Sequence, residues 1–375
     1  MRARFALSRV VAIALALCSL SVTPSLRVVK EPLPQRLDDR AFWAIASDFS
    51  EDGGYFRSDN LVSNETAFQQ VIPTLQRRIG PAGAYLGVGP DQNFTYIVAL
   101  KPRIAFIVDI RHQNMLLHLL YKALIEVSPT RNEFISRLFS RKRPRELTAA
   151  ATAEEMFAAY ERVAPDAKYF DANLKDVVRQ LTRRHGFALT SEDLQTIEQI
   201  YRAFLASGPD IAYSFPRGGW MRFPTYRELM TETDGQGGHR SYIATEQNYQ
   251  VLREFQRNNL IVPVTGDFSG RKALRSVAAY LRDHGVLVTA FYTSNVEQYL
   301  FRGTEWQQFY DNVAQMPIDG ESTFIRAAFS NFGYYYPSQA SGLQSATLLN
   351  PISALLAAYR EGRIRGYADV IEMSR

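Results

Sequence analysis

The sequence predicts an α/β fold with a mostly parallel sheet and a large helical insertion. Two short apolar runs, at residues 84–87 and 104–110, flank a segment at 92–100 that is long enough for one helix. Near-continuous apolar runs of this kind are typical of parallel strands that are buried on both faces. The alternation of strand and helix returns after residue 246, whereas residues 128–245 show helical patterns and no clear strand. Strands that alternate with helices favour right-handed parallel crossovers.

The first two strands end in residues that suit a nucleotide pocket. The first strand runs into Gly87-Val88-Gly89, and Asp109 closes the second strand, 20 residues after Gly89. Glycines at such a turn let backbone N–H groups approach a ligand, and an acid at this distance can hold both ribose hydroxyls. The dinucleotide fingerprint has a third glycine where this chain has Gln92. The alternative is an ordinary tight turn, with Asp109 as the N-cap of the next helix.

Helices are expected on both sides of this unit. One covers residues 64–78, with Ser63 or Asn64 as its cap, and ends at Gly-Pro directly before the first strand. A second, strongly apolar helix covers residues 114–126. A helix followed by a strand with a glycine turn is the order expected of a Rossmann-like core.

The middle of the chain is interpreted as a helical insertion. Thr190 with Asp193 supplies a capping signal for its last long helix. The insertion closes with Gly218-Gly219-Trp220 and the glycine-rich residues 234–239, which are interpreted as a flexible crossing loop because no strand precedes them. A dense basic cluster is interpreted as a solvated loop, with contact to an anion or a membrane as the alternative. The cluster contains Arg141, Lys142, Arg143 and Arg145, and the expected helices lie at 133–139, 153–162, 174–184 and 192–206.

The second α/β stretch supplies the remaining strands. Gly266-Asp267-Phe268 follows its first strand directly. Asn350-Pro351 is interpreted as a cap and a proline at the first position of a helix. The expected elements are, in order, a helix at 246–258, a strand at 260–265, a helix at 271–283, and strands at 285–292, 323–329 and 367–371.

The first 21 residues have the pattern of an export signal. Three arginines precede an apolar run at residues 10–20, which is too short to span a bilayer but suits the core of a signal peptide. Cleavage after Ser21 is expected, lipidation at Cys18 is the competing possibility, and an uncleaved anchor is the third. The chain is therefore expected to be exported and periplasmic or membrane-anchored, with a signal of the bacterial type.

Length and composition fit one α/β domain with an insertion. The 375 residues are 46% hydrophobic and 22% charged, which is enough for a sizeable core. The expected parts are a signal peptide at 1–21, an irregular N-terminal segment at 22–62, the first half of the Rossmann-like domain at 63–127, the helical insertion at 128–245 and the second half at 246–375.

Charge and composition argue against several classes of function. The net charge of +5 falls to +2 once the three arginines of the signal are removed, so no nucleic-acid partner is expected. Cys18 is the only cysteine, and the five histidines lack metal-ligand spacing, so no metal site is expected. No Gly-x-Ser-x-Gly elbow or Walker-type loop is present. A small molecule is the expected partner.

The order of these strands resembles the class I S-adenosylmethionine-dependent methyltransferase fold: a glycine-turn strand, a ribose-acid strand, a strand that ends in an acid, and closing strands. The resemblance covers residues 64–127 and 246–330. It implies that Gly87 and Gly89 line the methionine end of the cofactor S-adenosylmethionine and that Asp109 holds its ribose. It also implies that Asp267 lies where such enzymes often place substrate or catalytic groups.

Two positions depart from that family's pattern. Tyr85 replaces the acid two residues before the first glycine, and Asp91 replaces the third glycine. Asp91 or Asp59 would then have to contact the amino group of the cofactor. The whole chain is also similar to uncharacterised bacterial proteins that often carry export or lipoprotein signals, and segments 108–111, 266–268 and 294–297 carry this likeness. Arg111, in the first of these segments, is grouped with the expected cofactor-binding residues.

A site at the strand ends is favoured without the family as well, since open α/β sheets bind ligands outside the carboxyl ends of their strands. Asp267 is the predicted general base or substrate-orienting carboxylate, and a turn residue is its alternative. Tyr292, Asn295 and Glu297 are the predicted substrate-binding residues. Asn295 and Glu297 are alternatively a helix start and its first-turn acid.

Three hypotheses about function follow. The first is a methyltransferase that binds S-adenosylmethionine and an unidentified small acceptor. The second is a non-enzymatic exported or lipid-anchored protein that keeps the scaffold for binding or structure, because the cofactor is made in the cytoplasm. The third, a dehydrogenase with a nicotinamide cofactor, is disfavoured by the missing third glycine.

Overall fold

A six-stranded sheet with the strand order β3-β2-β1-β4-β5-β6 forms the centre of the protein. The computed structural model describes residues 31–214, 222–329 and 345–374. Strands β1 to β5 are parallel, and β6 pairs antiparallel with β5 at the edge. The predicted α/β fold is therefore confirmed. The strands are β1 (Ala84–Gly87), β2 (Ile104–Asp109), β3 (Ile261–Thr265), β4 (Val288–Ser294), β5 (Thr323–Phe329) and β6 (Ser345–Pro351).

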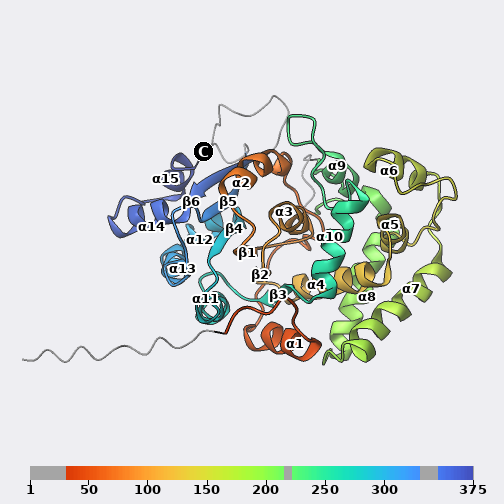
Figure 1. Cartoon of the computed structure of the whole chain (residues 1–375), viewed down its shortest axis with the longest axis horizontal. Helices are drawn as coiled ribbons and strands as arrows, with labels where there is room; N and C mark the ends of the chain where they lie inside the picture. The colour runs from red at the N-terminus through yellow and green to blue at the C-terminus, as the bar shows by residue number, and fades with distance from the viewer. Residues whose placement is uncertain (1–30, 215–221, 330–344, 375) are drawn as a thin grey trace, which may run out of the picture. The chain divides into compact units, whose positions relative to one another are not determined.

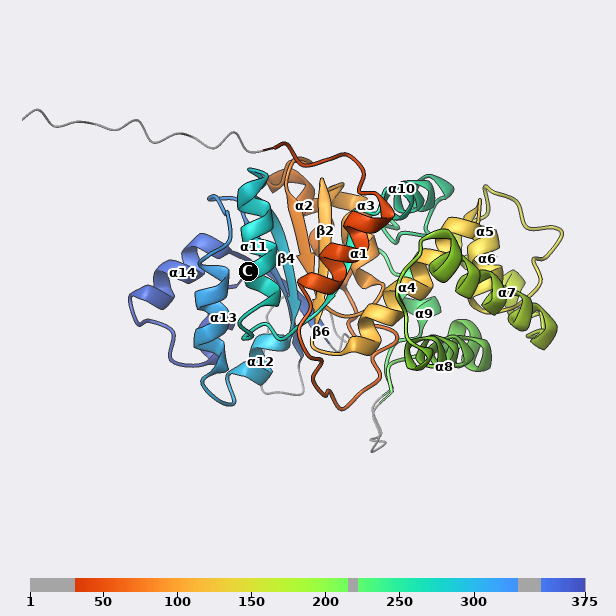
Figure 2. The same cartoon turned by 90° about the horizontal axis from the view of Figure 1, so that it is seen from below.

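Helices cover both faces of this sheet (Figures 1 and 2). On one face lie α3 (Gln92–Leu100), α4 (His112–Val127) and α10 (Glu246–Arg257), and on the other lie α11 (Ala273–Asp283) and α13 (Glu305–Val313). All six residues of β2 are buried, as expected of a central parallel strand that is covered on both sides.

The register of the strands brings their carboxyl ends to one edge. Gly87 of β1 lies opposite Ile107 of β2, and Asp109 of β2 lies opposite Thr265 of β3. Strand β4 joins the other side of β1, so the strand order reverses between β1 and β4. This reversal is the point at which open α/β sheets bind their ligands.

The region between α4 and α10 is helical, as predicted. Thr190 and Asp193 form the expected capping box at the start of α8. The predicted helix at 174–184 is the end of α7 followed by a π-helical turn at Gln180–Arg184. The helices of this region are α5 (Arg131–Leu138), α6 (Ala153–Glu161), α7 (Ala167–Arg179), α8 (Ser191–Ser207) and α9 (Tyr226–Thr231).

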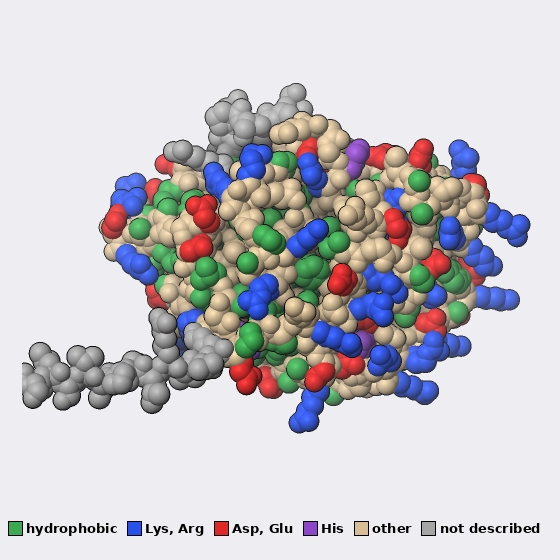
Figure 3. All heavy atoms as spheres, viewed as in Figure 1, with side chains coloured by type: hydrophobic (Ala, Val, Ile, Leu, Met, Phe, Trp, Pro, Cys, Tyr) green, Lys and Arg blue, Asp and Glu red, His purple; other side chains and the backbone are tan. Residues whose placement is uncertain are grey.

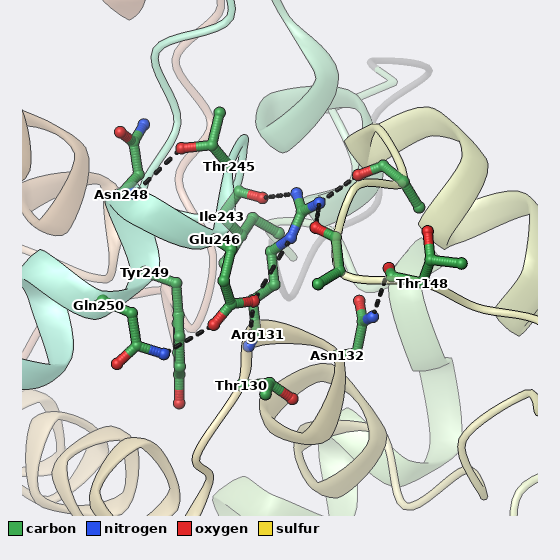
Figure 4. Close-up of polar contacts among 12 residues, drawn as sticks. Thr130, Arg131, Asn132, Thr148, Ile243, Thr245, Glu246, Asn248, Tyr249 and Gln250 are labelled. Carbon is green, nitrogen blue, oxygen red and sulfur yellow. Dashed lines mark hydrogen bonds and ion pairs between the residues drawn. The ribbon is translucent and has the colours of Figure 1, made fainter.

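One buried arginine joins this helical region to the segment before α10 (Figure 4). Arg131 Nη1 donates to the carbonyl oxygens of Ile243 at 2.8 Å and Ala244 at 2.7 Å. Its Nη2 donates to the carbonyl oxygens of Ala149 at 3.1 Å and Ala151. Four carbonyl groups from two separate segments therefore accept hydrogen bonds from one guanidinium group.

The N-terminal part is more regular than the sequence suggested. The segment at 22–62 contains the helix α1 (Asp39–Asp48), which Asp38 caps by accepting a hydrogen bond from the N–H of Ala41 at 2.7 Å. The predicted helix at 64–78 begins later, as a short 3₁₀ turn, η1 (Phe68–Val71), followed by α2 (Ile72–Arg78). Ser63 and Asn64 are therefore not its caps: Ala67 is the N-cap residue of η1, and Ser63 and Asn64 line the cavity described below.

The C-terminal prediction was partly wrong. Strand β5 was predicted with the correct bounds, but residues 367–371 belong to the helix α15 (Tyr367–Glu372). A short apolar run does not by itself distinguish strand from helix. Asp369, which accepts from the N–H of Gly366 at 3.1 Å, marks the helix start. The last strand is β6, which contains Asn350, and Pro351 is the N-cap of α14 (Ile352–Arg360).

The predicted signal peptide, Cys18 and the Gly218-Gly219-Trp220 segment lie outside the described residues. Across the described ranges, none of the helices combines the length and apolar character needed to cross a bilayer. Lys and Arg side chains, mixed with acids, gather at the margin formed by α5 to α8 (Figure 3). Of the basic cluster, Lys142 pairs with Asp166 at 2.9 Å, and Arg141 donates to the carbonyl oxygens of Tyr160 and Val163.

Candidate functional site

A cavity of about 410 Å³ opens at the carboxyl ends of β1 to β4, where the strand order reverses. Its lining is mainly apolar, and its volume falls in the range of roughly 300–1,000 Å³ that is typical of small-molecule sites. Three predicted site residues, Gly87, Asp91 and Glu297, do not line it. The predicted residues that do are Gly89, Asp109, Arg111, Asp267, Tyr292 and Asn295.

The glycine turn is held from behind by Asn93. Its Nδ2 donates to the carbonyl oxygens of Val88 at 2.9 Å, Gly89 at 3.3 Å and Pro90 at 2.7 Å. A Cβ atom on Gly87 would lie 1.9 Å from Asn93 Oδ1, so a larger residue there would require Asn93 to shift. Gly89 has a φ of +79°, which glycine adopts at no steric cost. Gly89 alone of the two glycines lines the cavity.

A buried histidine also supports this turn. His118 Nε2 lies 2.9 Å from the carbonyl oxygen of Gly89, and burial lowers the pKa of His118 to about 4. The imidazole is therefore neutral at physiological pH, and its Nε2–H donates to Gly89.

Asp109 and Arg111 form a closed pair on one wall of the cavity. Arg111 Nε donates to Asp109 Oδ1 at 3.0 Å, Nη2 donates to Oδ2 at 2.8 Å, and the backbone N–H of Arg111 donates to Oδ1 at 2.9 Å. Arg111 Nη1 donates to the carbonyl oxygen of Asp59 at 2.5 Å. Arg111, not Asp109, occupies the N-cap position of α4. Since a carboxylate has about four acceptor sites, about one remains on Asp109 for a ligand.

Asp91 lies behind the cavity rather than in its wall. The hydroxyl of Tyr242 donates to Asp91 Oδ2 at 2.8 Å, and burial raises the pKa of Asp91 to about 7. Asp59, the other acid considered for the cofactor's amino group, is not among the lining residues either, although its neighbour Asn60 is.

Asp267 is a turn residue that also lines the cavity. Its Oδ1 accepts from the N–H and from the hydroxyl of Ser269, each at 2.8 Å, which is the geometry of a turn residue. Its backbone N–H donates to Glu51 Oε1 at 3.0 Å. Asp267 nevertheless lines the cavity, and within the described ranges its Oδ2 has no hydrogen-bond partner.

The end of β4 contributes the opposite wall. Ser294 has a φ of +51°, and the pairing of β4 with β5 shifts register at this point. Such backbone conformations in residues other than glycine concentrate at functional sites. Asn295 follows as the N-cap residue of α12 (Val296–Leu300), as one reading of the sequence predicted. Tyr292 lines the cavity, and its hydroxyl donates a hydrogen bond within the wall.

Glu297 has a structural environment. Its Oε1 accepts from Arg326 Nη2 at 3.0 Å and from the hydroxyl of Tyr310 at 2.7 Å, and its Oε2 accepts from Arg326 Nε. The side chains of Glu297 and Arg326 are both fully buried. The structure thus does not bring Glu297 together with Tyr292 and Asn295.

The sequence analysis missed Glu65, which lines the cavity and is 1% exposed. Its Oε1 accepts from the hydroxyls of Tyr292, at 2.7 Å, and Ser294, and its Oε2 accepts from Gln92 Nε2 at 3.0 Å. Burial raises the pKa of Glu65 above its usual value. The polar residues around Glu65 were interpreted as helix caps, and only the tertiary fold carries them to the strand ends.

Aromatic side chains form the rim of the cavity. Phe56 and Tyr299 meet edge to face, with ring centroids 5.4 Å apart. The guanidinium of Arg302 lies 4.6 Å from the centroid of the Tyr299 ring, and Tyr55 is 83% exposed beside Phe56. These rings offer a flat apolar surface next to the polar strand ends.

His112 lies apart from this cavity. Its Nε2 is 2.8 Å from Asp193 Oδ1, its Nδ1 is 3.2 Å from Thr265 Oγ1, and its side chain is half exposed. Within the described ranges, no group of three His, Cys, Asp or Glu side chains could hold a metal ion.

Fold and cavity define an α/β Rossmann-like protein with a cavity at the switch point of its sheet. The chain belongs to the family described as a domain of unknown function, DUF7790, whose model matches residues 60–350. The match includes the ends of β1 to β4 and therefore most of the cavity wall. A comparison with curated proteins finds no match.

Proposed function

We propose that this protein binds S-adenosylmethionine in the cavity at the strand ends and is a methyltransferase-like exported protein. The observation that carries the proposal is the convergence of Gly89, Asp109 and Asn295, from three different strand ends, on one cavity of about 410 Å³. The resemblance to class I methyltransferases assigns the first two of these residues to the cofactor.

The residues around the cavity suit an adenosyl compound. Phe56 and Tyr299 offer ring faces and edges against which a purine can pack. Asp109 keeps about one acceptor site for a ribose hydroxyl. When bound, S-adenosylmethionine would supply an electrophilic methyl group. Under this proposal Asp267 Oδ2, which has no hydrogen-bond partner among the described residues, accepts the proton of a small acceptor.

A non-enzymatic binding protein is the second candidate. The observation that favours it is the bidentate pairing of Asp109 with Arg111, which already occupies most of the carboxylate that a ribose would use. Under this candidate, the cavity holds a small molecule in the exported protein without group transfer. Nucleic acid is not proposed as a partner under either candidate.

Isothermal titration of the purified protein with S-adenosylmethionine, S-adenosylhomocysteine and NAD tests the proposal. Micromolar binding of both adenosyl compounds, without binding of NAD, is the expected result. Binding of S-adenosylmethionine without turnover of any methyl acceptor supports the second candidate. The proposed function fails if none of the three compounds binds.

Binding measurements on variants test whether the ligand lies in the cavity. Asp109→Ala is expected to weaken adenosyl binding by about 2–3 kcal/mol, as for a lost charge-assisted hydrogen bond. Asp193→Ala is the control, because Asp193 lies outside the cavity. Since Asp109→Ala also leaves Arg111 unpaired, Asp109→Asn and a thermal melt of each variant separate lost binding from lost folding.

Export is proposed from the predicted signal, with membrane association through the signal or through Cys18. Fractionation of cells and sequencing of the N-terminus test this point. A mature chain that begins at Val22 in the periplasm is the expected result, and a lipid-modified Cys18 would replace cleavage after Ser21. A full-length chain in the cytoplasm would refute export.

A further inference from the structure

Glu65 lies at the wall of the cavity and has no cationic partner among the described residues. Tyr292, Ser294 and Gln92 donate its hydrogen bonds, and all three are neutral side chains. Its Oε1 accepts two of these bonds and its Oε2 accepts one, so Oε2 keeps the larger acceptor capacity. Burial of a carboxylate without a positive partner is costly unless a ligand or a proton neutralises it.

Three arginines line the same cavity, and among the described residues none of them forms a hydrogen bond or ion pair with Glu65. Arg111 is committed to Asp109 in a bidentate pair, the Arg302 guanidinium lies over the Tyr299 ring, and Arg57 is engaged elsewhere. The titratable groups that face Glu65 are the phenols of Tyr85 on β1, Tyr96 on α3 and Tyr292 on β4. Burial raises the pKa of each of these phenols well above its usual value, so they remain neutral.

We infer that Glu65 is the anchor for a protonated primary amine of the ligand, so that the cavity selects aminated over amine-free compounds. An ammonium group supplies both the missing positive charge and an N–H donor for Oε2. The identity of the amine as part of an adenosyl compound rests on the proposed function, but the selection for an amine does not.

Amine binding is coupled to protonation of Glu65. Burial raises the pKa of its carboxyl group, so in the protein without ligand Glu65 stays protonated to a higher pH than an ordinary glutamate. An ammonium group favours the ionised carboxylate and expels that proton. Affinity for the amine is therefore expected to fall as the pH is lowered, and binding is expected to release protons to the buffer.

The experiment uses two compounds that differ only in the amine. S-adenosylhomocysteine and its deaminated analogue, carboxypropyl thioadenosine, are titrated into wild type, Glu65→Gln and Glu232→Gln. Glu232 is the matched control because it is another largely buried acid, its pKa is raised to about 7 by burial, and it lies outside the cavity. Wild type and Glu232→Gln are expected to prefer the amine at least tenfold, and Glu65→Gln is expected to lose that preference.

Propylammonium and propanol provide a test that needs no adenosyl binding. If propylammonium stabilises wild type, propanol does not, and Glu65→Gln loses this effect, the inference is supported. This holds even when both adenosyl compounds fail to bind and the proposed function falls. An equal response of wild type and Glu65→Gln to propylammonium overturns the inference. An equal loss of affinity for S-adenosylhomocysteine and for carboxypropyl thioadenosine in Glu65→Gln overturns it as well.

Discussion

Glu65 and Glu297 are both buried beside β4, yet among the described residues only Glu297 is paired with a cation. Glu65 accepts hydrogen bonds from Tyr292 and Ser294, whereas Glu297 accepts from Thr293 at 3.3 Å. Since successive side chains of a strand point to opposite faces, the two acids reach β4 from its two sides. Glu297 has Arg326 as its cation, whereas the donors to Glu65 within the described ranges are all neutral.

This difference in cationic partners distinguishes Glu297, an acid with a structural role, from Glu65, the acid proposed to bind a ligand. A buried glutamate that is paired with arginine and tyrosine has its charge and its acceptors satisfied within the protein. A buried glutamate that lines a cavity and accepts hydrogen bonds only from neutral groups has a charge that a ligand can balance. Sequence position alone favoured Glu297, because it follows a strand end, and gave no reason to choose Glu65.

Breaking the paired acid is expected to have the largest effect. Arg326→Met leaves Glu297 buried without a cation and should lower the free energy of unfolding by about 3–5 kcal/mol. Glu65→Gln keeps the shape and hydrogen-bonding capacity of its site and should change it by less than about 1 kcal/mol. Urea denaturation of both variants measures the contrast. A cost for Glu65→Gln as large as that for Arg326→Met would make Glu65 a structural acid.

The glycine turn that borders the cavity gives the next largest effect. Gly87→Ala places a Cβ atom 1.9 Å from Asn93 Oδ1 and should cost about 1–3 kcal/mol in unfolding free energy. Gly80→Ala is the control, because nothing lies within 4 Å of a Cβ atom there. Equal melting of the two variants would show that Asn93 moves aside easily and that the turn is not rigid.

Asp91 is a third buried acid in this comparison. Among the described residues it has no cationic partner, and it does not line the cavity. Burial raises its pKa to about 7, so the folded state holds a proton that the unfolded state releases above its usual value of 3.8. The contribution of protonated Asp91 to the free energy of unfolding is therefore fully present below about pH 4. It is lost as the pH rises to about 7, with a slope of up to about 1.4 kcal/mol per pH unit. The difference in unfolding free energy between wild type and Asp91→Asn, measured from pH 4 to 8, should follow this decline. A difference independent of pH would contradict the protonated state of Asp91.

The contact between His112 and Asp193 should have the smallest effect. The His112 side chain is half exposed, pairs of polar side chains near the surface contribute about 0–1 kcal/mol, and neither residue lines the cavity. His112→Gln should therefore leave adenosyl affinity unchanged and shift the unfolding free energy by less than about 0.5 kcal/mol. Loss of binding in this variant would extend the site beyond the cavity to the start of α4.

The sheet was predictable because its strands are apolar runs bounded by clear stops. The bounds of β1, α3 and β5 were predicted correctly, and those of β2, β3 and β4 to within three residues. The antiparallel strand β6 was missed because Asn350-Pro351 suggested a helix start, and α15 was mistaken for a strand because its apolar run is only a few residues long. In both cases the local sequence pattern fits strand and helix equally, and tertiary contacts decide between them.

The site was predictable only where it lies on the strand ends. Gly89, Asp109, Asp267, Tyr292 and Asn295 all follow or end strands, and the register carries them to one cavity. Asp91 and Glu297 also follow strand ends, but their side chains turn into the core. Glu65 and Phe56 come from the segment before β1, whose path over the sheet edge no periodicity reveals.

A crystal structure of the protein grown with S-adenosylhomocysteine tests the central claim most directly. The account predicts electron density for the compound in the cavity between Gly89 and Asp109, with its amino group on Glu65. A cavity without such density at a saturating concentration, or the compound bound elsewhere, would contradict the account.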